Sequence, residues 1–196
     1  MYRLESLPYA LSWEDVRKLL ASATCASARD IRDRAILMLL AVYGMRRGEV
    51  ASLQLDHIDW ARRRLCVPRL KRRQPQIYPL TRTVAEVLAR YVDSVRPNVA
   101  YREVFIRLQA PHRPIGDGVI YHVVRERLRS LGIKAAHLGP HALRHSCATR
   151  LLAQGLTLKE IGDHLGHRSS AATSIYAKVD LPALREVGDF DLGDLP

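Results

Sequence analysis

The chain has 196 residues, and 47% of them are hydrophobic, which is enough to bury the core of one domain. Thirty-one lysines and arginines against 20 acidic residues give a formal net charge of +11. This charge favours a polyanionic partner, although a merely basic soluble protein has the same balance.

The cysteines and the apolar runs indicate the setting. Cys25, Cys66 and Cys147 are far apart, odd in number and without metal-ligand spacing, which indicates reduced thiols in a cytoplasmic protein. The longest apolar run, residues 35–42, is too short to cross a membrane, and the N-terminus shows no signal peptide.

Two long helices and a short one are predicted near the N-terminus. Ser12 can cap the first helix, because acidic residues follow in its first turn and apolar residues then recur at helical spacing. The second is predicted over residues 28–43 and ends at Gly44. Its apolar block, residues 35–42, is too continuous for a surface helix, so we expect it to be central. Residues 44–53 are expected to form a turn and a short helix.

Three short strands are expected next, over residues 57–60, 64–67 and 76–80. The last two strands flank a basic loop, residues 68–75, and the chain becomes helical again at Thr81. Three short strands among predicted helices indicate a mainly helical α+β domain.

The C-terminal half is predicted to be helical after an irregular stretch. Helices are expected over residues 118–131, 140–154 and 157–165, and a last one carries Tyr176. On the second of these, His141, Arg144 and His145 lie at positions i, i+3 and i+4 and share one face. Such a face either stabilises a buried polar network or holds an anion, and the pattern alone leaves both open.

Four short motifs occur in a fixed order along the chain: Gly44-Met-Arg46-Arg-Gly-Glu49, His141-Ala-Leu-Arg144-His, Leu165-Gly-His167, and Tyr176 nine residues later. This arrangement resembles the tyrosine recombinase (phage integrase) family over nearly the whole chain. The resemblance implies a tyrosine recombinase catalytic domain over residues 1–180, with the three strands forming a small antiparallel sheet at one edge. It also implies a tail, residues 181–196, that docks on a neighbouring protomer. It also implies that the family's N-terminal core-binding domain is absent.

Lys71 is a fifth match to the family, eight residues before Pro79, although the glycines that often flank this lysine are missing. It is the only lysine in a loop otherwise rich in arginine, and arginine is a poor proton donor because its pKa exceeds about 12. The alternative is a solvated basic loop that touches DNA phosphates, and we assign DNA binding to Arg69, Arg72 and Arg73.

The resemblance implies metal-independent breakage and rejoining of DNA strands. Its catalytic set is Arg46, Lys71, His141, Arg144, His167 and Tyr176, with Tyr176 as the nucleophile. Glu49 is expected to orient an arginine, although a surface carboxylate is the alternative, and His145 is expected to have a supporting or packing role. No cofactor is expected. A metal site at His164 and His167 is not expected either, because no carboxylate is placed to complete it.

Double-stranded DNA is the expected partner, with a homo-oligomer, a tetramer, assembled on it and no membrane association. Two alternatives remain at this stage: a type IB topoisomerase-like enzyme that nicks and religates, and a non-catalytic DNA-binding regulator. Rival nucleophiles also exist in principle, although none follows a Leu-Gly-His motif; they are Tyr78, Tyr91, Tyr101 and Tyr121.

Overall fold

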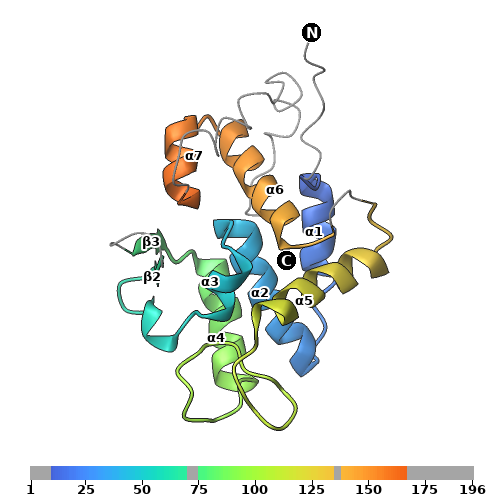
Figure 1. Ribbon diagram of the computed structural model, residues 1–196, viewed down its shortest axis with the longest axis vertical. Helices are drawn as coiled ribbons and strands as arrows, with labels where there is room; N and C mark the ends of the chain where they lie inside the picture. The colour runs from blue at the N-terminus through green and yellow to red at the C-terminus, as the bar shows by residue number, and fades with distance from the viewer. Residues whose placement is uncertain (1–9, 70–74, 135–137, 167–196) are drawn as a thin grey trace.

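The computed structural model describes residues 10–69, 75–134 and 138–166, and within them the chain forms seven α-helices and three short strands (Figure 1). Helix α2, Ala28–Tyr43, runs through the middle of the molecule. Every side chain from Ala35 to Ala41 is buried, so the predicted central helix is confirmed. It ends where Gly44 adopts a left-handed conformation with φ of 59°.

Five of the other described helices pack on α2. Helix α1, Trp13–Ala21, begins at Ser12, whose side chain accepts a hydrogen bond from the backbone of Asp15, as predicted for a cap. The remaining helices that pack on α2 are α3 (Arg47–Ala51), α4 (Arg82–Ser94), α5 (Asp117–Ser130) and α6 (Pro140–Ala153). Within the described ranges, no helix combines the length and the apolarity needed to span a membrane.

The small sheet lies at one edge of this helical body (Figure 1). Strands β1 (Ile58–Asp59), β2 (Arg64–Val67) and β3 (Gln76–Pro79) pair antiparallel in the order β1-β2-β3. The predicted sheet is confirmed, but its first strand is shorter than expected, because Leu55–His57 form a 3-10 turn instead. Leu65 pairs with Tyr78, and both side chains are buried toward the helices.

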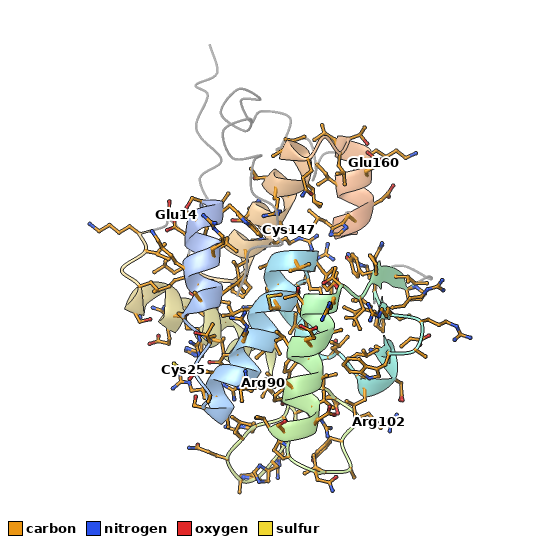
Figure 2. The ribbon with its side chains drawn as sticks, turned by 180° about the vertical axis from the view of Figure 1, so that it is seen from behind. Glu14, Cys25, Arg90, Arg102, Cys147 and Glu160 are labelled. Atoms are coloured by element: carbon orange, nitrogen blue, oxygen red, sulfur yellow. The ribbon has the colours of Figure 1, made fainter. Side chains whose placement is uncertain are left out.

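Helix α7, Leu158–Leu165, stands apart from the main core and packs on α6. It begins with a capping box between Thr157 and Glu160 and ends at Gly166, which is left-handed with φ of 66°. A small apolar cluster joins it to α6; the buried members are Cys147, Ala148, Ile161 and Leu165. Figure 2 shows Cys147 inside the molecule and Glu160 on the outer helix.

Candidate active site

Arg46 lies at the start of α3, immediately after the turn that ends α2. Its Nη1 donates to Glu49 Oε1 at 2.8 Å, and its Nη2 donates to the carbonyl of Gly166 at 3.1 Å. Glu49 Oε2 also accepts from the Arg46 backbone at 2.8 Å. The Arg46 side chain remains 44% exposed, whereas that of Glu49 is 12% exposed. The geometry therefore favours the orienting role of Glu49 over that of a surface carboxylate.

Arg144 lies on α6 and is buried, with 4% of the residue exposed. Its Nη1 donates to the carbonyl of Gly44 at 2.5 Å, and its Nη2 donates to that of Leu165 at 2.7 Å. Arg46 and Arg144, 98 positions apart in the sequence, thus bond to the consecutive carbonyls of Gly166 and Leu165. Close approach at Gly44 allows this meeting, because a Cβ there would lie 2.6 Å from a methyl of Leu165.

Arg69 corrects one expectation from the sequence. It is not an exposed loop cation, because only 4% of its side chain is accessible. Its Nη1 donates to the Leu165 carbonyl and lies 3.6 Å from Glu49 Oε1, and its Nη2 donates to the Tyr78 hydroxyl at 2.5 Å. Arg69 follows Leu65 and Val67 at the two-residue spacing of a strand, and both of those side chains are fully buried. This alternation is the signal that predicts an inward side chain.

The site therefore gathers positive charge at the C-terminal end of α7. Arg46, Arg69 and Arg144 carry three positive charges against the one negative charge of Glu49, so these four side chains have a formal charge of +2. The carbonyl end of a helix carries a partial negative charge, equivalent to about half an elementary charge, and offsets part of this excess. What remains is suited to binding an anion.

The two histidines of α6 lie beside this cluster at different depths. The ring of His141, an exposed residue, is 5.5 Å from that of His145, which is half-buried. Burial lowers the pKa of His145, and the charges of His141 and Arg144 lower it further. His145 is therefore neutral near pH 7, in keeping with a supporting or packing role.

Two residues of the site were not predicted from the sequence, Tyr78 on β3 and His164 on α7. The Tyr78 hydroxyl donates to the His164 carbonyl at 2.5 Å, and the two rings meet edge to face at 5.0 Å. Burial raises the pKa of Tyr78 to about 12, so its hydroxyl stays protonated. Burial likewise raises the pKa of Tyr91, whose hydroxyl accepts from the backbone of Ile106. Neither tyrosine is placed to act as a nucleophile.

Five predicted site residues lie outside the described residues: Lys71, Arg72, Arg73, His167 and Tyr176. The described chain stops at Gly166, one residue before His167, and at Arg69, two residues before Lys71. In the part of the chain that the structure covers, no three histidine, cysteine or acidic side chains come together as a metal site.

A mainly helical domain with a three-stranded sheet at one edge, as seen here, is the fold of tyrosine recombinase catalytic domains. The crystal structure of the XerA recombinase superimposes with a TM-score of 0.79 at 27% identity, covering 94% of this chain and 64% of that one. Residues 10–181 match the Phage integrase family, and the chain belongs to this family.

Two relatives show how much of a longer protein this chain corresponds to. The Sinorhizobium fredii protein y4rA is 41% identical over 94% of this chain, which spans 45% of the length of y4rA. Tyrosine recombinase XerD of Listeria innocua is 31% identical over 93% of this chain, which spans 62% of that protein.

Proposed function

We propose that this chain is the catalytic domain of a site-specific DNA recombinase that breaks and rejoins DNA strands through a covalent 3′-phosphotyrosyl intermediate. The observation that carries the proposal is the arginine cluster at the end of α7, with three guanidiniums and one carboxylate. A phosphodiester is a monoanion, and planar guanidiniums bind its oxygens through paired hydrogen bonds.

In the proposed reaction, the Tyr176 oxygen attacks the scissile phosphorus. A bond forms between that oxygen and phosphorus, and the bond from phosphorus to the 5′-oxygen breaks. Lys71 gives a proton to the departing 5′-oxygen, and His141 accepts or relays the tyrosine proton. The phosphodiester bond energy is conserved in the tyrosyl ester, so attack by another 5′-hydroxyl reverses the step without a nucleotide.

The arginines supply the electrostatic part of this reaction. Negative charge grows on the non-bridging oxygens in the transition state, and fixed donors aimed at those oxygens stabilise it without reorganisation. Arg46 is the more exposed of the two predicted phosphate ligands, and Glu49 holds its guanidinium in place. Arg144 is anchored on two backbone carbonyls, and we assign His167 as a third donor to the phosphate.

A nicked suicide substrate tests the proposal. After cleavage the short 5′-hydroxyl fragment diffuses away, so the covalent protein–DNA adduct accumulates and migrates slowly on a denaturing gel. We expect an adduct with the wild-type chain and none with Tyr176→Phe. Tyr101→Phe is the matched control, because Tyr101 is 44% exposed and lies outside the site. An adduct that persists in Tyr176→Phe contradicts the assignment of the nucleophile.

The products then separate the recombinase from the alternatives. Holliday junctions formed between two cognate sites support strand exchange, whereas relaxation of supercoils alone indicates a topoisomerase-like enzyme. DNA binding with no adduct on any substrate indicates a regulator and overturns the proposal. Because phosphate contacts release counterions, DNA affinity should fall steeply as salt rises.

Assembly on DNA forms the last part of the proposal. We infer that double-stranded DNA is the partner, that four copies assemble on paired sites, and that residues 181–196 join neighbouring protomers. Deleting residues 183–196 should then reduce strand exchange more than it reduces binding to a single site. Equal loss of both activities argues against a docking role for the tail.

A further inference from the structure

Arg69 is buried between the two arginines that we assign to the phosphate. It shares the Leu165 carbonyl with Arg144, and it shares Glu49 Oε1 with Arg46. The Arg46 bond to that oxygen is 2.8 Å long, and the Arg69 contact is 3.6 Å. A shift of Arg69 would therefore change the acceptors available to both neighbours.

Tyr78 extends the same network to the preceding carbonyl of α7. Its hydroxyl accepts from Arg69 Nη2 at 2.5 Å and donates to the His164 carbonyl at 2.5 Å. Because burial keeps the hydroxyl protonated, both hydrogen bonds can form at once. Arg69 and Tyr78 together thus hold the carbonyls of His164 and Leu165, while Arg46 holds that of Gly166.

The fit of Arg69 against the end of α7 is tight. A Cβ added to Gly166 would lie 1.7 Å from Arg69 Nη1, so the guanidinium occupies the space that any other residue would fill. A small buried apolar cluster joins α7 to α6, and the His164 ring meets the Tyr78 ring of β3. The arginine network consequently fixes the helix end that leads into His167.

We propose that Arg69, supported by Tyr78, is a positioning residue: it sets the guanidiniums of Arg46 and Arg144 and the end of α7 without touching DNA. The proposal rests on the proposed function for its effect on cleavage, but its effect on Arg144 can be measured separately. It replaces the sequence-based assignment of Arg69 as a DNA contact.

The cleavage test uses Arg69→Met, which keeps the length of the side chain and removes its donors. We expect the rate of adduct formation at saturating DNA to fall by about 10- to 100-fold, because small displacements of catalytic groups have effects of that order. The Kd for DNA should stay within about twofold, and its salt slope should not change. A direct phosphate contact would instead weaken binding and reduce that slope by about one.

Two further variants separate geometry from charge. Arg69→Lys keeps the charge but cannot span the Leu165 carbonyl and the Tyr78 hydroxyl with one planar group, so we expect it to stay well below wild type. Tyr78→Phe should lower the rate by about three- to tenfold, as expected for one lost support of the network. A wild-type rate in Arg69→Lys, or in Arg69→Met, overturns the proposal.

Arg96→Met is the matched control for loss of a structural arginine. Arg96 donates to the backbone carbonyls of Glu103 and Val104, in a loop that includes Arg102. Figure 2 shows Arg102 in the lower half of the molecule, well away from Glu160 of α7. We expect this variant to lose thermal stability and to keep the cleavage rate of the folded protein.

A readout that does not need cleavage is the Nε–Hε signal of Arg144 in ¹⁵N-labelled protein, identified by its loss in Arg144→Lys. In Arg69→Met this signal should shift and exchange faster with water, and in Arg96→Met it should not change. If wild type forms no adduct, the proposed function fails, and this spectrum still decides the role of Arg69. An unchanged Arg144 signal in Arg69→Met overturns the positioning role.

Discussion

Two arginine networks in this molecule are built on opposite principles. At the end of α7, Arg46, Arg69 and Arg144 bond mainly to backbone carbonyls, with Glu49 as the carboxylate that contacts two of them. Between α5 and α2, Arg127 bonds instead to two carboxylates, at 2.6 Å to Asp30 and at 2.9 Å to Asp33.

The second network is balanced by its own side chains. Arg32 contacts the other oxygen of Asp33 at 2.8 Å, so the two guanidiniums within hydrogen-bond distance face two carboxylates, and Asp33 is 1% exposed. A third arginine, Arg29, lies farther from Asp33, at 3.7 Å, and is 70% exposed to solvent. Carbonyls satisfy hydrogen-bond donors without cancelling charge, whereas carboxylates do both. The α5–α2 network therefore neutralises its own charge, so that removing one arginine leaves a buried carboxylate less well paired, while the α7 network leaves positive charge for an external anion.

The largest expected effect breaks the balanced network. Arg127→Met takes one guanidinium from the buried Asp33, which keeps Arg32, so we expect a loss of about 3 kcal/mol, the low end of the cost of breaking a buried ion pair. We expect the melting temperature to fall by roughly 10 °C in thermal denaturation. Below that temperature the folded protein should cleave DNA at the wild-type rate. Arg29→Met is the control: Arg29 lies 3.7 Å from the same carboxylate but is 70% exposed, so little stability should be lost.

The charged network should respond in the opposite way. Arg46→Lys replaces a planar fork by a point charge, and we expect cleavage to fall by about a hundredfold, comparable with losing one preorganised donor. The melting temperature should change little, because the Arg46 side chain is 44% exposed. The neighbouring Arg47→Lys is the control, since Arg47 pairs with Asp117 on the surface at 3.0 Å. Equal cleavage by both variants would remove the distinction between the two networks.

Local signals in the sequence predicted most of the fold. Gly44 and Gly166 both adopt the left-handed conformation that ends a helix, and the capping box of Thr157 and Glu160 starts α7. These features depend on a few neighbouring residues, so they can be recognised without tertiary information. The family resemblance assigned Arg46 and Arg144 to one catalytic set, and in the structure they bond to adjacent carbonyls.

Long-range pairing could not be predicted in the same way. Arg69 lies in the basic loop predicted over residues 68–75. Because charged side chains in loops are usually solvated, we expected its side chain to be exposed. The inward direction depends on the strand alternation that begins at Leu65 and on acceptors that α7 supplies 95 residues later. Tyr78 was equally ambiguous, because its partner carbonyl lies 86 positions away.

An intermediate effect is expected at the glycine that ends α7. Gly166→Ala introduces left-handed strain of about 1–2 kcal/mol and also displaces Arg69, so cleavage should fall by roughly tenfold. Gly155 also lies in the left-handed region, with φ of 87°, but a Cβ there meets nothing within 4 Å. Gly155→Ala should therefore lose similar backbone stability and keep its cleavage rate. If both alanine variants cleave equally, contact with Arg69 does not matter.

The smallest expected effect is a dependence of stability on pH. The two networks should lose stability in different pH ranges. Burial lowers the pKa of His164 below its usual 6.5, and the charges of Arg69 and Arg144 lower it further. The pKa of Asp30 lies below its usual 3.8, because Ser27 donates a hydrogen bond to it, which is the larger effect, and Arg127 donates another. Both groups bind a proton more readily in the unfolded chain, so each contributes stability that is lost as pH falls.

The stability contributed by His164 should be lost below about pH 6.5, and the stability contributed by Asp30 only near pH 4 and lower. Protonation of His164 is costly because its buried Nε2 has no hydrogen-bond partner within the described residues and lies near two guanidiniums.

The melting temperature of the wild-type chain should drop by a few degrees between pH 7.5 and 5.5. His164→Gln should reduce that drop, although His57 and His145 share the same direction of shift. Arg127→Met should leave the drop in melting temperature between pH 7.5 and 5.5 unchanged and alter the pH dependence only at acidic pH, since Arg127 is one of the groups that lower the pKa of Asp30. If the melting temperature of Arg127→Met falls less than that of wild type between pH 7.5 and 5.5, the two networks are coupled.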